Sequence, residues 1–317
     1  MLQYLILQLC DTATSYCHYG NSHCEARLMP LPMLEKAVLW AMKEDLSVQV
    51  VYPDYALPQE YREVIDRVDH TDIVSSHSDL KDVAQVVVVD DWDELQDISF
   101  AKDAVYVLRT TLTSFYKRYE ELTSVLQQVS RLNVVFLDVE HFTDADAAVY
   151  GKALDFLAKD IEQLYVNGGQ VQLNLLTDRM MLNKMNNCGA GETNVTLAPD
   201  GRFYVCPAFY NESNGYSIGS LDEGLDVKNA QLYKLDHAPI CRHCDAYHCK
   251  RCIWLNRNTT LDVNTPSHEQ CMMAHLERNA SRLLLDALRK HGTFLPEQES
   301  ITEIDYLDPF EKRKEWQ

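Results

Sequence analysis

The stretch Val86-Val87-Val88-Val89-Asp90-Asp91 contains the pattern that recurs along the first half of the chain and decides its fold. Consecutive β-branched apolar residues suit a strand that is buried on both faces of a sheet. A parallel sheet covered by helices buries its strands in this way. The two aspartates follow the strand directly, at the end where such sheets carry their functional loops.

Similar short runs rich in Val, Leu or Ile lie before and after this stretch. The predicted strands cover residues 4–9, 48–52, 86–89, 105–108, 134–139 and 171–175. Segments with a helical period alternate with them at 32–43, 59–68, 114–129, 144–165 and 178–185. This alternation predicts an α/β fold of about six β/α units, arranged as a partial barrel or as an open doubly wound sheet.

The loops after these strands carry mostly charged side chains. They contain Cys10, Asp54, Asp90, Asp91, Arg109, Asp138, Glu140, Thr177, Asp178 and Arg179. Taken singly, acidic residues at strand ends are commonly helix N-caps or solvated loop groups. Taken together, they mark the predicted functional mouth, because the carboxyl ends of parallel strands meet at one edge of the sheet.

The composition excludes several classes of protein. The chain has 29 Lys and Arg against 48 Asp and Glu, and its formal net charge of -19 repels nucleic acid and anionic membranes. No apolar run approaches the length of a membrane span, and the apolar start lacks the basic segment of a signal peptide. We therefore expect a cytoplasmic protein with no nucleic-acid or membrane partner. In a reducing compartment, its ten cysteines indicate metal binding rather than disulfides.

Seven cysteines in the second half of the chain are spaced as ligands of iron-sulfur clusters. They are Cys188, Cys206, Cys241, Cys244, Cys249, Cys252 and Cys271. Iron-sulfur clusters and zinc both select thiolates, and each C-x2-C step lets two sulfurs of one loop reach one metal centre. Zinc is the alternative, because paired C-x2-C steps also form tetrahedral sites. However, one zinc ion would leave three of these cysteines without a role.

The pattern resembles the SPASM extension of radical S-adenosylmethionine (SAM) peptide maturases. That extension carries a cysteine, a Gly-x4-Cys hairpin, a knuckle of four cysteines and one later cysteine. Gly201 and Cys206 match the hairpin, whereas the gaps within the knuckle at 241–252 are shorter than usual. The resemblance implies two auxiliary 4Fe-4S clusters. One would be held by Cys241, Cys244, Cys249 and Cys271, and the other by Cys188, Cys206 and Cys252, with an open iron for a substrate thiol.

The texture of the sequence changes from apolar runs to a polar, cysteine-rich stretch near residue 187. With the resemblance, this predicts a radical SAM-like partial barrel over 1–186, a SPASM-like domain over 187–275, and a C-terminal helix and acidic tail over 276–317. Segments 193–197 and 202–206 flank Pro-Asp-Gly and predict a hairpin. An amphipathic helix is predicted over 272–290.

The start of the chain resembles a degenerate radical SAM cluster motif. That motif is C-x3-C-x2-C after the first strand, and its three thiolates leave one iron free to chelate the cofactor. Cys10 and Cys17 stand at the outer positions here, and Thr14 replaces the middle cysteine. Nearby substitutes are His18, His23 and Cys24. The Gly-Gly-Glu run that grips the methionyl amine is replaced by Tyr-Pro-Asp-Tyr at 52–55. Two interpretations therefore remain. Either this region binds an N-terminal 4Fe-4S cluster with S-adenosylmethionine, or Cys10 and Cys17 are ordinary small buried residues.

Phrases at 15–19, 174–181, 206–210 and 241–247 are similar to those of CXXX-repeat peptide maturases. This resemblance implies an enzyme that modifies a ribosomally made, Cys-rich precursor peptide, with a reductant protein as a second partner. Cys10 and Cys17 are then the candidate catalytic residues. Two alternatives remain: a non-catalytic iron-sulfur scaffold that binds the precursor, and a zinc-binding adaptor.

Overall fold

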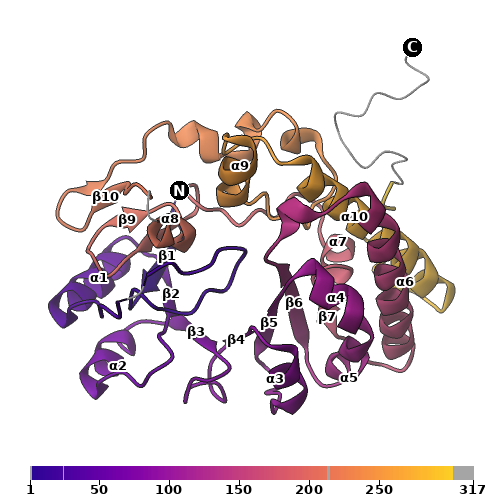
Figure 1. Ribbon diagram of the computed structural model, residues 1–317, viewed down its shortest axis with the longest axis horizontal. Helices are drawn as coiled ribbons and strands as arrows, with labels where there is room; N and C mark the ends of the chain where they lie inside the picture. The colour runs from indigo at the N-terminus through magenta and orange to yellow at the C-terminus, as the bar shows by residue number, and fades with distance from the viewer. Residues whose placement is uncertain (1, 24, 213–214, 303–317) are drawn as a thin grey trace. The chain divides into compact units, whose positions relative to one another are not determined.

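The structure is a computed structural model that describes residues 2–23, 25–212 and 215–302. It divides the chain into two compact units, each of which the chain enters twice (Figure 1). Unit 1 comprises Met1–Val89 and Gly189–His237, and unit 2 comprises Asp90–Cys188 and Ala238–Gln317. Each unit takes in part of the predicted barrel and part of the predicted cysteine-rich domain. The three-domain division stays a prediction, and residues 303–317 of its acidic tail lie outside the described residues.

Unit 1 is built on a sheet with the strand order β4-β3-β2-β1-β8-β9. The strands are β1 (Tyr4–Gln8), β2 (Ser47–Val51), β3 (His70–Ser75), β4 (Val86–Val89), β8 (Asn194–Leu197) and β9 (Phe203–Tyr204). All neighbours are parallel except β8 and β9, which form the predicted hairpin. The hairpin was expected within the cysteine-rich domain. In the structure β8 instead pairs in parallel with β1 and extends the sheet.

Short helices complete unit 1. They are α1 (Leu31–Lys43), α2 (Gln59–Ile65) and α8 (Pro207–Asn211), with the strand pair β10 (Gly219–Ser220) and β11 (Gly224–Leu225). Trp40 of α1 packs on Phe203 of β9 with ring centroids 4.9 Å apart, so this helix covers the sheet near its β9 edge. The turn between β8 and β9 needs Gly201 because its φ of +80° is strained for other residues.

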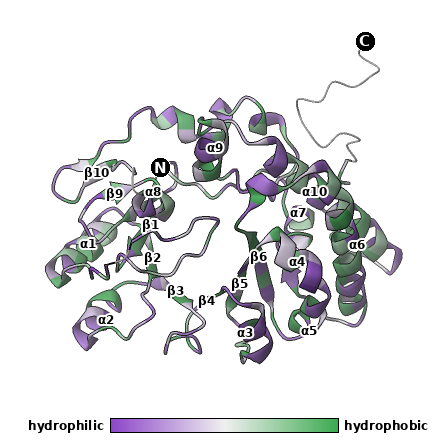
Figure 2. Cartoon of the chain, viewed as in Figure 1, coloured by the Kyte–Doolittle hydropathy of each residue, from purple (hydrophilic) through white to green (hydrophobic). Residues whose placement is uncertain are grey.

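Unit 2 carries the parallel strands β5 (Val105–Thr110), β6 (Arg131–Phe136) and β7 (Gln172–Leu173). The helices before the knuckle are α3 (Trp92–Asp97), α4 (Leu112–Arg118), α5 (Leu122–Leu126), α6 (Asp144–Val166) and α7 (Thr177–Met181). Those after it are α9 (Ile253–Thr260) and α10 (His268–Lys290). The helices α6 and α10 pack against each other. Both helices carry green, hydrophobic stretches beside purple, hydrophilic ones in Figure 2.

The predicted α/β class with a parallel, mostly open sheet is confirmed. The six predicted strands all exist, but β3 was missed because its sequence, His-Thr-Asp-Ile-Val-Ser, lacks a continuous apolar run. The predicted helix over 114–129 is divided into α4, a 3-10 turn and α5. The C-terminal helix starts earlier than predicted because Ser267 caps it, accepting a hydrogen bond from the Gln270 N–H at 3.3 Å. Within the described residues, no helix combines the length and apolarity that crossing a membrane requires.

Candidate iron-sulfur site

The four knuckle cysteines lie in unit 2, on short turns that lead into α9. Cys241 opens a 3-10 turn (η5, Cys241–His243), Cys244 ends it, and Cys252 immediately precedes α9. Cys249 lies in the loop between them, and Cys271 lies at the start of α10. The turns hold themselves together, since the N–H of Cys244 donates to the carbonyl of Cys241 at 3.1 Å. Turns and loops, rather than a helix or a strand, therefore hold the knuckle cysteines.

Three of these sulfurs accept hydrogen bonds from backbone N–H groups two or three residues further along the chain. The pairs are Ala246 with Cys244 (3.4 Å), Arg251 with Cys249, and Trp254 and Leu255 with Cys252. Each bond stabilises the charged form of the sulfur and lowers its pKa. Because metal centres bind the thiolate form, this arrangement favours ligation. Hydrogen bonds to sulfur are also a feature of protein-bound iron-sulfur clusters.

Burial opposes these bonds and keeps the thiols protonated while no metal compensates them. It raises the pKa of Cys241 to about 11 and the pKa values of Cys249 and Cys252 to about 12. Burial also raises the pKa of Cys244. A metal centre that binds here must displace protons, so metal binding and proton release are coupled.

Neighbouring charges group five cysteines of unit 2 into two sets. After burial, the charges that raise the pKa of Cys249 include those of Cys241 and Cys244. For Cys252 the neighbouring charge is that of Cys188. The sequence pattern likewise assigned Cys241, Cys244 and Cys249 to one cluster. It assigned Cys188 and Cys252 to the other.

Cys188 and Cys206 belong to different units. The N–H of Cys188 donates to the carbonyl of Lys250 at 3.2 Å, which fixes Cys188 beside the knuckle in unit 2. Cys206 lies in unit 1, where it directly precedes α8. Their common role as cluster ligands stays a prediction.

Asp245, inside the knuckle, is anchored by two arginines. Arg278 of α10 is completely buried and donates from Nη1 to Oδ1 of Asp245 at 2.8 Å. Arg179 of α7 donates from Nε to the Asp245 carbonyl at 2.6 Å, and its guanidinium lies 4.3 Å from the ring centroid of Tyr247. Burial lowers the pKa of Arg179. Both cations act on the Cys244 thiol and favour its charged form.

The histidines near the knuckle have different partners. The Nε2 of His248 lies 3.0 Å from Oε2 of Glu277, whose Oε1 accepts from the Tyr150 hydroxyl at 2.5 Å. Sequence reasoning missed His275, whose Nε2 lies 3.6 Å from Sγ of Cys244. The sequence did contain a signal for this contact, because His275 lies one helical turn after the predicted ligand Cys271 and therefore on the same side of the helix.

The donor set is rich in thiols, which iron-sulfur clusters and zinc both select. Among the residues that the structure describes, no three His, Cys, Asp or Glu side chains form a group that could hold one metal ion. In a 4Fe-4S cluster each iron takes its own thiolate, so the sulfurs surround a larger body. The N–H···S bonds and the nearby cations suit thiolate ligands.

The N-terminal cysteines lie in unit 1, in the loop between β1 and α1. Cys10 is fully buried, and the Tyr55 hydroxyl donates to its Sγ at 3.3 Å. Cys17 is partly exposed, and Cys24 lies outside the described residues. Thr14 donates from its hydroxyl to the carbonyl of Tyr52 at 3.0 Å. The side chain at the position of the middle cysteine thus ties this loop to the end of β2.

A polar cluster beside Cys10 was also missed by sequence reasoning. Asp11 is buried and accepts hydrogen bonds from the Tyr210 hydroxyl and from Arg27, whose Nε lies 3.3 Å away. Tyr210 lies on α8, four residues after Cys206. The cluster therefore joins the Cys10 loop to the segment that carries Cys206.

Three acidic residues of the predicted mouth have local structural partners. Asp91 caps α3, and Asp138 accepts from the Leu112 N–H at 2.8 Å. Asp178 pairs with Arg131 at 2.9 Å. Such bonds are those of ordinary caps and ion pairs, so these carboxylates are not assigned to the site.

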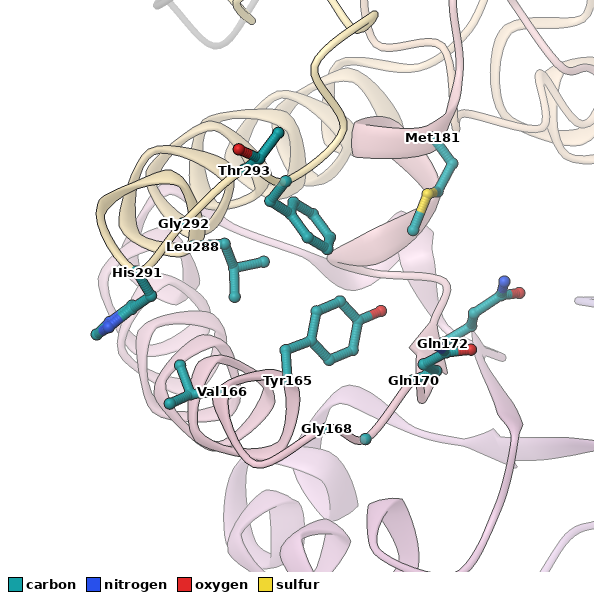
Figure 3. Close-up of a pocket in the computed structure, with 12 residues that line it drawn as sticks. Tyr165, Val166, Gly168, Gln170, Gln172, Met181, Leu288, His291, Gly292 and Thr293 are labelled. Carbon is teal, nitrogen blue, oxygen red and sulfur yellow. The ribbon is translucent and has the colours of Figure 1, made fainter.

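A cavity of about 480 Å³ lies elsewhere in unit 2, between the ends of α6 and α10 and the start of β7 (Figure 3). The rings of Tyr165 and Phe294 pack there with centroids 5.5 Å apart and planes tilted by 50°. Gln172, the first residue of β7, also lines it, so the cavity is at the amino end of that strand. No cysteine lines it, and it is separate from the candidate site.

No protein-family model and no curated protein sequence matches the chain. Solved structures of anSMEcpe match its fold. Native anSMEcpe with bound AdoMet and Cp18Cys peptide has a TM-score of 0.59 and 13% identity, covering 92% of this chain and 100% of that chain. A histidine-tagged form of anSMEcpe with bound AdoMet has a TM-score of 0.60 and 12% identity, with 92% and 100% covered. At this identity the likeness concerns the fold alone. The chain has an α/β fold that resembles a partial radical SAM barrel, followed by a cysteine-rich segment and a C-terminal helix.

Proposed function

We propose that the chain is an iron-sulfur peptide maturase of the radical SAM/SPASM type that modifies a Cys-rich, CXXX-repeat precursor peptide. The observation that carries the proposal is the knuckle, in which the sulfurs of partly buried cysteines accept N–H···S bonds beside the cations Arg179 and Arg278. An isolated zinc ion needs fewer sulfurs than the chain supplies. The fold adds support, because anSMEcpe was solved with AdoMet and a peptide bound.

In this proposal, two 4Fe-4S clusters are held by the cysteines that the sequence pattern assigns. The knuckle cysteines Cys241, Cys244 and Cys249 share one cluster with Cys271. Cys188, Cys206 and Cys252 share the other. What supports the division is that the Cys188 charge acts on Cys252, while those of Cys241 and Cys244 act on Cys249. When bound, such clusters accept and donate single electrons and can take a thiolate at an open iron.

The chain's own residues then prepare the site for a peptide thiol. The Tyr55 hydroxyl holds Cys10 through its bond to Sγ. Asp11, Arg27 and Tyr210 fix the loop that carries Cys10. Cys10 and Cys17 are the residues that we propose for catalysis.

A second candidate function is a precursor-binding scaffold that keeps its auxiliary clusters but has no N-terminal cluster. The Thr14 hydroxyl favours it, because that side chain secures the loop to the Tyr52 carbonyl where a ligand would stand in the radical SAM motif. In a scaffold, Cys10 and Cys17 serve only as small buried or half-buried residues.

Anaerobic purification with iron, sulfide and zinc analysis tests both candidates. The wild type is compared with the Cys10→Ser/Cys17→Ser double variant. About twelve irons that fall to about eight indicate an N-terminal cluster and favour the maturase. About eight irons in both proteins favour the scaffold or a maturase that works without this cofactor. Zinc without sulfide refutes both candidates.

Substrate class needs its own assay. A synthetic peptide with cysteines in CXXX repeats is incubated with the reduced protein, and its mass is followed. The matched control peptide carries Ser at each Cys. A mass change that requires the cysteines supports the proposed substrate, whereas an unchanged mass, or the same mass change in the control peptide, contradicts it.

A further inference from the structure

Helix α10 turns a polar face toward the knuckle. Cys271, His275 and Arg278 follow one another at intervals of four and three residues, which places them on one side of the helix. Arg278 reaches Asp245 at 2.8 Å, and His275 reaches Cys244 at 3.6 Å. The helix that supplies the predicted last ligand thus also contacts the loop that supplies the others.

His275 is placed to act on the Cys244 sulfur through its imidazole N–H. Its side chain is buried, with an exposed fraction of 4%, so water does not compete for the sulfur. A thiolate accepts hydrogen bonds and donates none, so Nε2 is the protonated nitrogen in the ligated state. The distance of 3.6 Å suits an N–H···S bond.

We infer that His275 is a positioning residue that raises the reduction potential of the cluster held by Cys241, Cys244, Cys249 and Cys271. This inference rests on the proposed function. One electron enters the oxidised cluster from a low-potential donor such as dithionite, no bond forms or breaks, and the proton stays on Nε2. The reduced cluster is more negative, so a donor aimed at its sulfur stabilises it more than the oxidised form.

The neighbouring cation does not replace this effect. Arg278 forms an ion pair with Asp245, and the carboxylate offsets much of its charge at the sulfur. Removing the pair as a whole changes the local charge little. The N–H of His275 contacts the Cys244 sulfur directly, so its loss acts on that sulfur.

The test is an EPR-monitored redox titration of the anaerobically purified full chain. His275→Leu removes the donor, and His275→Gln restores an N–H donor on an uncharged side chain. The control is His291→Leu, near the far end of α10, where Nε2 contacts Glu162 at 2.8 Å. We expect one cluster of His275→Leu to be about tenfold harder to reduce, a shift of about -59 mV for one electron. His275→Gln should recover most of the shift, and the control should show none.

Pulsed EPR of the reduced wild type with 15N-labelled histidine covers the case in which His275→Leu fails to assemble the cluster. A weak nitrogen coupling that His275→Gln abolishes supports an N–H···S donor. A strong coupling, typical of nitrogen bound to iron, overturns the inference and makes His275 a ligand. If His275→Leu has its full iron content and an unchanged reduction potential, the inference about His275 is overturned but the proposed function is not. A wild type without iron and sulfide overturns the proposed function as well.

Discussion

The ion pair between Asp245 and Arg278 gives an asymmetric prediction for stability. Arg278 has no exposed surface, whereas the Asp245 side chain is 24% exposed and has Arg179 as a second neighbour at 3.9 Å. Asp245→Ala leaves a fully buried cation whose other acceptor is the neutral Asn279 side chain. We expect this variant to lose about 3–5 kcal/mol of the free energy of unfolding.

Arg278→Met should cost less because it leaves a partly hydrated carboxylate that still lies near Arg179. Met fills most of the volume of the missing side chain, so the loss is chiefly one charge-assisted hydrogen bond, about 2 kcal/mol. The Asp245→Ala/Arg278→Met double variant should be more stable than the sum of the single effects predicts. The reason is that neither charge is then left buried alone.

Urea unfolding followed by tryptophan fluorescence measures these differences in anaerobic samples with matched iron content. Trp254, two residues after Cys252, reports on this region. The order of stability should be wild type, Arg278→Met, then Asp245→Ala. If Arg278→Met is the less stable single variant, or if the two effects are additive, the reasoning from burial is refuted.

Three further predictions concern other parts of the chain. Cys249→Ser should lower the iron content by about four per chain, and an unchanged content in elemental analysis would contradict its role as a ligand. Asp72, whose Oδ1 lies 3.4 Å from Nε2 of His70, raises the pKa of that histidine from 6.5 to about 9. This contribution is complete below pH 6.5 and is lost as the pH rises through about 9. Urea unfolding across this window should show a loss on the order of 1 kcal/mol, allowing for partial exposure, and His70→Gln should flatten the profile. Phe203→Ala removes a buried ring that packs on Trp40 and should cost about 3–5 kcal/mol in urea unfolding without changing the iron content. A cost below about 1 kcal/mol would indicate that the site collapses around the missing ring.

Much of the fold could be predicted because burial on both faces leaves a local trace in the sequence. The Val86–Val89 strand coincides with its predicted range. The strand His70–Ser75 was missed because polar residues interrupt its apolar positions. The parallel pairing of β8 with β1 also escaped prediction, since its hairpin signal specifies only the partner that is near in sequence.

The candidate site divides in the same way. Spacing named the cysteines of the knuckle, because the ligands of one loop must lie close together in sequence to reach one centre. It did not find His275, Arg278 or the contact of Tyr210 with Asp11. Each of these contacts joins residues that are at least 31 positions apart.

By itself, the sequence determined the parallel α/β class and the acidic charge of this protein, and it supplied the predicted set of thiol ligands. These properties depend on residue type and on short-range periodicity, and both can be read from the sequence without knowledge of the tertiary packing. Only the tertiary structure decided which cations lie near the sulfurs, which histidine reaches Cys244, and that Thr14 is bonded to the Tyr52 carbonyl. Burial and partnership arise when distant segments pack, and they set what a given side chain can do.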